Sequence, residues 1–449
     1  MSSQNSNMGT ENISKLMFRL ALPSIAAQLI NVLYNIVDRM YVGRIPDVGA
    51  DALTGLGVSS PILLIVSAFS MFISGGAAPL ASIALGKGDK EESDKILGTS
   101  VFLLTIISFI LPIIIFLNLE ALLYMFGASD VTYSYANQYT SIYLLGTIFV
   151  QYALGLNLFI SSQGQAKVAM FSVVIGAITN IILDPIFIFA FDMGVAGAAI
   201  ATVISQALSA TFVVRFLVSD KSIFRIRKEC LKIDWKIAKK SLALGITPFS
   251  MQITESAIMI VFNNSLLQYG GDIYVGTMTI LQSLIQLLVV PVSGFTHGIQ
   301  PIISYNYGAR NRERVLKTVK YTAIIALATT FSYYILVSSV PSIFASIFTT
   351  DTQLIDLVSK VLPIFMAGIS LFGMQMTAQT FFLGTGQAGK PLFIALLRKV
   401  IILIPLALIL PKFFGVMGVF YSEPIADTIS ATTSGILLYM SVKKLRDDE

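Results

Sequence analysis

Apolar runs of membrane-spanning length recur along this chain of 449 residues. A helix needs about 20 mostly apolar residues to cross a hydrocarbon core about 30 Å thick. Only 12% of the residues are charged, about half the share of soluble domains, so the predicted solvent is lipid. Apolar character on all sides, with many small residues, favours helices over a barrel. We therefore predict an all-α integral membrane protein with twelve transmembrane helices, at 16–42, 53–78, 96–118, 131–162, 168–191, 193–218, 239–268, 273–305, 318–340, 353–384, 391–412 and 414–441.

The basic residues predict the orientation of these spans. Of the 30 Lys and Arg residues, 24 lie on one side of the predicted membrane, in alternate loops, at the span ends next to those loops or beyond the last span. The positive-inside rule then places both termini, and the basic loop in the middle of the chain, in the cytoplasm of a cell that carries the protein in its plasma or inner membrane. The net charge of +5 thus indicates topology and contact with lipid headgroups, and we expect no nucleic-acid partner.

The two halves of the chain resemble each other at a shift of 221–222 residues. Pro79 and Gly86, for example, align with Pro301 and Gly308. Each copy holds six spans, so both enter the membrane in the same direction as a parallel repeat. Such pseudo-symmetric lobes usually bind substrate at their interface and rock against each other. The predicted units are an N-terminal lobe at 15–219, a basic cytoplasmic linker at 220–237 and a C-terminal lobe at 238–442.

The fifth span carries the most informative polar residues. Asn180 and Asp184 are four residues apart, so they share one helix face. An ionised side chain at the membrane centre costs about 2.5–3.5 kcal/mol, and such residues usually face a cavity and bind or release something. Pro185 follows and loosens the local hydrogen bonding.

Two other spans of this lobe carry polar stripes. Each amide or hydroxyl of these stripes, taken singly, could be present only to form a hydrogen bond between helices. The acids favour a cavity instead, because two carboxylates in one dry space repel each other and at least one must bind a proton or a cation. Carboxylate, amide and hydroxyl oxygens also suit a hard monovalent cation, so H⁺ and Na⁺ remain alternatives. The stripes are Gln28, Asn31, Asn35 and Asp38 in the first span, and Thr202, Ser205, Gln206 and Ser209 in the sixth.

The C-terminal lobe has a different set. Glu255 lies near mid-membrane in the seventh span, one turn after Gln252, and we expect it to face a substrate cavity. Gln282 and Gln286 form an i, i+4 pair in the eighth span, which either lines that cavity or joins helices.

Four charged residues fall inside the last two spans. Arg398 and Lys399 lie in the eleventh span, and Glu423 and Asp427 lie in the twelfth at a similar depth. Since intramembrane charges usually pair, we predict an intramembrane ion pair among them. A structural role and a role in coupling both remain open.

The chain resembles the multidrug and toxic compound extrusion (MATE) family over residues 15–442. The resemblance rests on the order and spacing of the strings NIVDRMYVG (35–43), GKGD (86–89), GQAK (164–167), NIILDP (180–185) and GVAG (194–197). It implies a secondary active efflux antiporter that exchanges lipophilic organic cations for Na⁺ or H⁺.

The same resemblance implies roles for single residues. Asp38, Asn180 and Asp184 match the family's cation site, with the hydroxyl of Thr202 and the amide of Asn157 beside it. Glu255 matches an acid found in several bacterial branches. In the tenth span, where some branches carry an Asp, this chain has Gln and Thr, which favours coupling through the N-terminal lobe.

Two alternatives deserve comparison. A lipid-linked oligosaccharide flippase shares the architecture, but it would need several basic residues facing the central cavity, and we assign only Arg39, Arg398 and Lys399 to the membrane interior. An enzyme would need a nucleophile–base set or metal ligands, and the chain has one His and one Cys. We therefore expect no enzyme and no cofactor beyond the coupling ion, and a carrier that works as a monomer.

Overall fold

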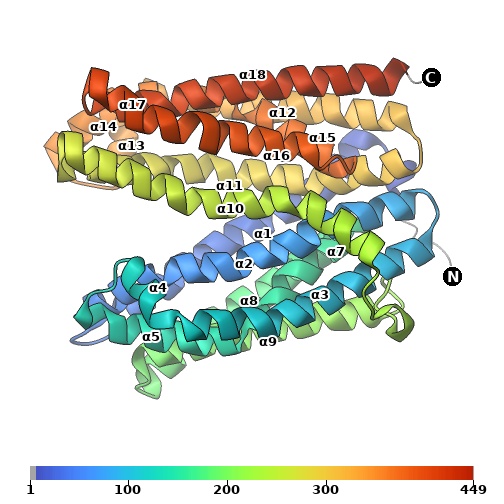
Figure 1. Cartoon of the computed structure of the whole chain (residues 1–449), viewed down its shortest axis with the longest axis horizontal. Coiled ribbons are helices and arrows are strands. Elements are labelled where there is room, and N and C mark those ends of the chain that lie inside the picture. The colour runs from blue at the N-terminus through green and yellow to red at the C-terminus, as the bar shows by residue number, and fades with distance from the viewer. Residues whose placement is uncertain (1–6, 448–449) are drawn as a thin grey trace.

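All regular structure in the described residues is helical (Figure 1). The computed structural model describes residues 7–447, apart from the side chains of residues 7, 256 and 272. The helices form two bundles, α1–α9 and α10–α18, which lie side by side in Figure 1. The first bundle consists of α1 (Ile13–Val42), α2 (Gly49–Gly86), α3 (Lys90–Leu117), α4 (Leu119–Met125), α5 (Asp130–Leu145), α6 (Thr147–Gln151), the π-helical η2 (Tyr152–Leu156), α7 (Asn157–Ser162), α8 (Ala166–Pro185), the π-helical η3 (Ile186–Ala190) and α9 (Gly194–Val218).

The second bundle repeats this order. It consists of α10 (Trp235–Gly270), α11 (Asp272–Gly308), α12 (Arg312–Ser339), α13 (Pro341–Ser346), α14 (Thr352–Phe365), the 3₁₀ turn η5 (Gly368–Leu371), α15 (Phe372–Gly384), α16 (Gly389–Leu396), the π-helical η6 (Leu397–Leu403), α17 (Ile404–Phe414) and α18 (Met417–Asp447). Short 3₁₀ turns lie at η1 (Asn7–Gly9) and η4 (Lys228–Cys230).

The twelve predicted spans correspond to these helices. Within residues 7–447, nine helical segments are long and apolar enough to cross a membrane, and two bent pairs qualify together. The bends are 65° between α5 and the segment 147–162, and 41° between α14 and the segment 368–384. The twelfth span, α18, is 31 residues long and less apolar because it carries Glu423 and Asp427. The prediction of an all-α membrane protein is confirmed.

The internal repeat is visible in where the helices begin. Matching helices of the two bundles, such as α3 and α12 or α5 and α14, begin 222 or 223 residues apart. Even the short α4 has a counterpart in α13. The offset of 221–222 residues expected from single aligned residues therefore reflects a repeat of the whole six-span unit.

The bundles pack against each other at one end, which we call the closed end; it is the end at which both termini lie (Figure 1). Glycines allow this contact. A Cβ added to Gly86 on α2 would overlap the carbonyl oxygen of Tyr305 on α11, and a Cβ added to Gly308 would overlap that of Ile83. The two contacts are related by the repeat, and away from them the bundles diverge toward the far end in Figure 1.

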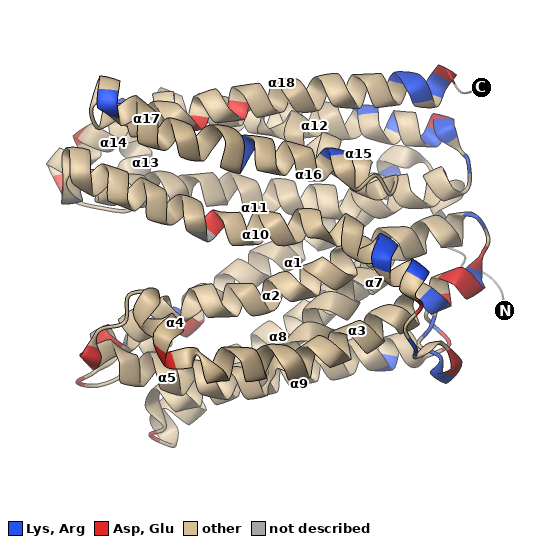
Figure 2. Cartoon of the chain, in the orientation of Figure 1, with Lys and Arg blue, Asp and Glu red and all other residues tan. Residues whose placement is uncertain are grey.

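The N-terminal segment also joins the two bundles at the closed end. Met8 is fully buried, with its sulfur against Gly164 of the first bundle. Its carbonyl oxygen accepts hydrogen bonds from Asn306 Nδ2 and Arg314 Nη2 of the second bundle, both at 2.9 Å. Arg314 also donates to the carbonyl of Glu11 at 2.8 Å. Figure 2 shows Lys and Arg gathered at this same end.

Replacing Gly86 with Ala should open the closed end. Ala is about 1 kcal/mol better than Gly inside a helix, so any loss comes from overlap with Tyr305, and such overpacking costs about 1–3 kcal/mol. Ser304 is buried beside this contact, so a Ser304→Cys reporter in a Cys230→Ser background measures its opening. We expect this cysteine to react with a thiol reagent about 5- to 150-fold faster when Gly86 is replaced by Ala than when Gly86 is kept.

The control is Gly57→Ala, because Gly57 also lies inside α2 but has open space where its Cβ would stand. Equal reporter rates in the two variants would contradict a closing role for the glycine contacts.

Candidate functional site

A buried polar group lies where α1, α8 and α9 meet. Asp38 of α1 is 7% exposed, Asn180 and Asp184 of α8 are fully buried, and Thr202 of α9 is 8% exposed. Helical periodicity turns Asn180 and Asp184 to the same side, and Pro185 ends the regular α8, which continues as the π-helical turn η3. The structure therefore brings together four residues that the sequence analysis assigned to a cation site.

Hydrogen bonds connect the members of this group. Asn180 Nδ2 donates to Asp184 Oδ1 at 3.1 Å and to Thr202 Oγ1 at 3.4 Å. The carboxyl groups of Asp38 and Asp184 lie close enough to interact directly. The hydroxyl of Tyr139 on α5 lies 3.4 Å from Thr202 Oγ1.

Three oxygens of the group have no hydrogen-bond partner among the described residues. They are Asp38 Oδ1, Asn180 Oδ1 and Asp184 Oδ2, each buried. The adjacent Arg39 is exposed, and its guanidinium donates to Ser60 at 3.5 Å instead. A buried carboxylate without a partner is costly, so this donor set suits a proton or a small hard monovalent cation. In the described part of the chain no cluster of three or more His, Cys, Asp or Glu residues could hold a metal ion.

A cavity of about 160 Å³ lies beside this group, lined by the first bundle and by one residue of the second. Gln28 and Asn31 of α1 and Gln206 of α9 line it, as predicted for cavity residues. Tyr34 and His297 line it as well, and the sequence analysis did not select them. His297 comes from α11 of the other bundle, so no spacing within the N-terminal repeat could have indicated it.

Two predicted residues lie away from their expected neighbours. Asn157 lines the cavity, but its amide donates to Ala169 O at 3.1 Å and to Ser172 Oγ at 2.5 Å. Ser172 precedes Asn180 by eight residues, about 12 Å along α8, so Asn157 does not join the cation group. Asn35 is exposed and donates to the carbonyl of Asn31 at 2.6 Å.

The charges predicted to pair within the last two spans do pair, in a different pattern. Arg398 binds both acids of α18, with Nη2 2.7 Å from Glu423 Oε1 and Nε 2.5 Å from Asp427 Oδ1. Lys399 binds Glu255 of α10 and donates to Met251 O at 2.8 Å. The predicted pairing of Lys399 with the α18 acids is therefore corrected, because consecutive residues of a helix point about 100° apart.

The remaining residues of the predicted substrate set are dispersed. Gln252 is partly buried, with Oε1 lacking a partner among the described residues. Gln282 is half-buried with its amide 3.8 Å from Met278 Sδ, whereas Gln286 is exposed. The C-terminal lobe thus contributes charge pairs, rather than a second cluster of unpaired acids.

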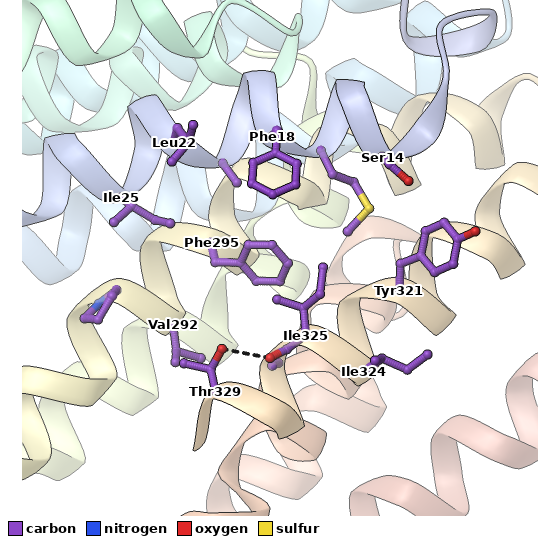
Figure 3. Close-up of a pocket in the computed structure, with 14 residues that line it drawn as sticks. Ser14, Phe18, Leu22, Ile25, Val292, Phe295, Tyr321, Ile324, Ile325 and Thr329 are labelled. Carbon is purple, nitrogen blue, oxygen red and sulfur yellow. Dashed lines mark hydrogen bonds between the residues drawn. The ribbon is translucent and has the colours of Figure 1, made fainter. Parts of the chain in front are cut away.

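A larger cavity of about 390 Å³ lies at the seam of the bundles (Figure 3). Phe18 and Leu22 of α1 face Phe295 of α11 and Ile325 of α12 across it. Its lining contains no charged side chain and none of the predicted site residues, so it can accommodate lipid chains or apolar groups but offers no ion site.

Removing the charge of Arg398 should destabilise the protein. Arg398→Gln leaves Glu423 and Asp427 buried without their cation, and breaking a buried ion pair on one side costs about 3–5 kcal/mol. Denaturation of the purified protein in detergent measures this loss. Arg39→Gln removes an exposed arginine without an ion pair and should change stability by no more than about 0.5 kcal/mol; equal losses would contradict the role of the pair.

Comparison with known proteins gives the family. A model of the MatE family matches residues 23–186 and 249–409. The chain is 25% identical over 437 residues to "Multidrug export protein MepA" of Staphylococcus aureus (strain N315), covering 97% of this chain and 96% of that protein. It is 26% identical over 446 residues to the protein of the same name from Staphylococcus haemolyticus (strain JCSC1435), covering 98% and 96%.

Solved structures show the same fold. A crystal structure of MATE in the bent conformation superimposes with a TM-score of 0.93 at 22% identity, over 100% of this chain and 99% of that one. An outward-facing multidrug resistance MATE family transporter of the MOP superfamily gives a TM-score of 0.91 at 22% identity, over 99% of each chain. Because the family model matches both halves and the two-lobe fold matches throughout, this chain belongs to the MatE family of multi-pass membrane transporters.

Proposed function

We propose that this protein is a secondary active multidrug exporter that exchanges lipophilic organic cations for H⁺ or Na⁺ by alternating access. The observation that carries the proposal is the pair of buried carboxylates, Asp38 and Asp184, with no basic partner among the described residues. An unpaired acid at this depth is typical of an ion pathway. The names of the relatives, multidrug export proteins, support the same direction of transport.

The neighbouring cavity supports a cationic, partly apolar substrate. Amides of Gln28, Asn31 and Gln206 line it together with Met71 and Met170. Thioethers adapt to ligands of different shape, and amide oxygens attract a positive charge without fixing it in one geometry. Such a lining favours a range of lipophilic cations over one specific ligand.

In the proposed cycle the closed end faces the cytoplasm, in agreement with the basic residues gathered there (Figure 2). An ion from outside binds at Asp38 and Asp184 and removes their mutual repulsion. The helices α1 and α8 then repack. They bend at Pro23 inside α1 and at the π-helical turn after Pro185, because the regular helical hydrogen bonds are interrupted there. The drug is released outward, and the lobes rock once the cavity is empty of it.

A flippase for lipid-linked oligosaccharides is less compatible with the charges. It would need free cations facing the cavity to bind a pyrophosphate, whereas Arg398 and Lys399 are both held by acids. Of the three basic residues assigned to the membrane interior, that leaves Arg39 without an ion pair among the described residues.

Neutralising either carboxylate should abolish coupled transport. In proteoliposomes loaded with ethidium, a fluorescent organic cation, we expect efflux driven by a pH gradient or by a Na⁺ gradient, and the effective gradient identifies the ion. Asp38→Asn and Asp184→Asn should each reduce this efflux to the level of protein-free liposomes, because the ion loses its charged ligand.

Asp51→Asn is the control, since Asp51 is an exposed carboxylate in the first turn of α2, and it should retain wild-type efflux. Wild-type efflux from both site variants at equal protein density would overturn the assignment. No efflux by the wild-type protein under either gradient would shift the proposal to lipid-linked substrates.

A further inference from the structure

Five ionisable side chains form a second cluster, in the C-terminal lobe, which we call the C-lobe charge cluster: Glu255 of α10, Arg398 and Lys399 of η6, and Glu423 and Asp427 of α18. Figure 2 shows acidic segments partway along α10 and α18, and a basic segment between α16 and α17, away from the charges at the helix ends. The cluster is therefore distinct from the Asp38–Asp184 group, which belongs to the other bundle.

The π-helical segment η6 connects the two halves of the cluster. It spans Leu397–Leu403 and interrupts the regular helix at the two basic residues. Arg398 points to α18 and Lys399 points to α10, as their ion pairs show. π-helical turns inside α-helices occur frequently at functional sites.

The charges of the cluster do not balance. It holds three carboxylates and two cations, so one negative charge remains when all five groups are ionised. Glu423 is 6% exposed, and while its Oε1 binds Arg398, its Oε2 has no hydrogen-bond partner among the described residues. An uncompensated charge buried in this way is costly.

No neighbouring charge supplies the missing cation. The elements η5 and α15, which pack against α18, carry no charged residue. The other charged residues on helices packed against α18 are exposed or lie near a helix end. They are Lys236, Lys239 and Lys240 of α10, Arg312, Glu313, Arg314, Lys317 and Lys320 of α12, Asp356 and Lys360 of α14, Lys390 of α16 and Lys412 of α17.

We propose that the C-lobe charge cluster binds one proton, held at Glu423 Oε2, and that this site is separate from the ion site of the N-terminal lobe. A proton fits better than a metal ion, because each of the three carboxylates already accepts a hydrogen bond from Arg398 or Lys399, and these two cations would repel a metal ion. With the proton bound the cluster is neutral, and the unpartnered oxygen becomes a hydroxyl that can donate.

The cluster also provides a way to exchange this proton for a drug, which rests on the proposed function. The Glu255 side chain is 57% exposed, whereas that of Lys399 is 6% exposed, so Glu255 is the accessible edge of the cluster. An organic cation that pairs with Glu255 neutralises this carboxylate and leaves the positive charge of Lys399 uncompensated within the cluster. Arg398 and Lys399 then balance Glu423 and Asp427, and the proton leaves.

The test for the proton requires no transport. In an Asp38→Asn/Asp184→Asn background, infrared spectroscopy of the purified protein at about pH 7, where exposed carboxylic acids are ionised, should still show the C=O band of a protonated carboxylic acid. Adding Glu423→Gln should abolish the band, because the cluster becomes neutral without a proton.

The matched control is Glu255→Gln with Lys399→Gln, which removes one charge of each sign. It keeps Arg398 with two acids, so the band should persist. A band that survives Glu423→Gln, one that is lost in the control, or no band in the background would overturn the proposal. Asp427→Asn also neutralises the cluster, and the same loss is expected of it should Glu423→Gln not fold.

The exchange is tested separately. In the same background, ethidium added to weakly buffered protein should release a proton, and the Glu255→Gln/Lys399→Gln control should lose that release while it keeps the infrared band. Release that is unchanged in the control would overturn the exchange. If the wild-type protein transports no ethidium while the background variant shows the band, the proposed function is contradicted and the proton site remains supported.

Discussion

The main constraint on this structure is the free-energy cost of burying carboxylates within the membrane without a positively charged partner. Asp38 and Asp184 have only an amide and a hydroxyl beside them at the junction of three helices, so the cost is left for a bound ion to meet. The C-terminal lobe meets it with cations, because Arg398 and Lys399 hold three acids on two other helices. The two lobes of the repeat therefore treat their buried acids differently. Those of the N-terminal lobe have no cation from the protein, whereas those of the C-terminal lobe are paired with Arg398 and Lys399.

This asymmetry gives the lobes different mechanical properties. Hydrogen bonds and ion pairs in a medium of low dielectric are strong when fully made, so α10, η6 and α18 are held as a unit. The junction of α1, α8 and α9 depends on a few amide and hydroxyl contacts, and it contains Pro23, Pro185 and a π-helical turn. Rearrangement on ion binding is accordingly expected in the first lobe, against a stiffer second lobe.

Much of the fold could be predicted because lipid imposes a simple rule on sequence. Length and hydropathy located the spans, and a constant offset indicated the repeat, which the helix boundaries confirm. Asn180 and Asp184 could be paired because a helix places residues four apart on one face. The bends of 65° and 41° could not be predicted from the local sequence. Gly146 and Gly368 lie at these bends, and their lack of a Cβ leaves room for the side chains of Val203 and Asp427, which are distant in sequence.

In the site as well, the contacts that the sequence analysis failed to predict are those between residues distant in sequence. Lys399 was assigned to α18 by depth, yet depth alone does not decide between α18 and α10 when both carry acids. His297 enters the cavity from the other bundle, and Asn157 finds its partners on α8. Within one helix the sequence determines the face, whereas contacts between helices depend on rotations and crossings that a single sequence does not record.

The N-terminal segment has a consequence for the empty carrier. Met8 and Glu11 accept three hydrogen bonds from the second bundle while Met8 packs on Gly164 of the first. At about 0.5–1.5 kcal/mol each, these bonds add a threshold that the lobes must cross before the closed end parts. In the proposed cycle all three bonds would have to break each time the lobes rock, so the N-terminal segment stabilises the state in which this end is closed.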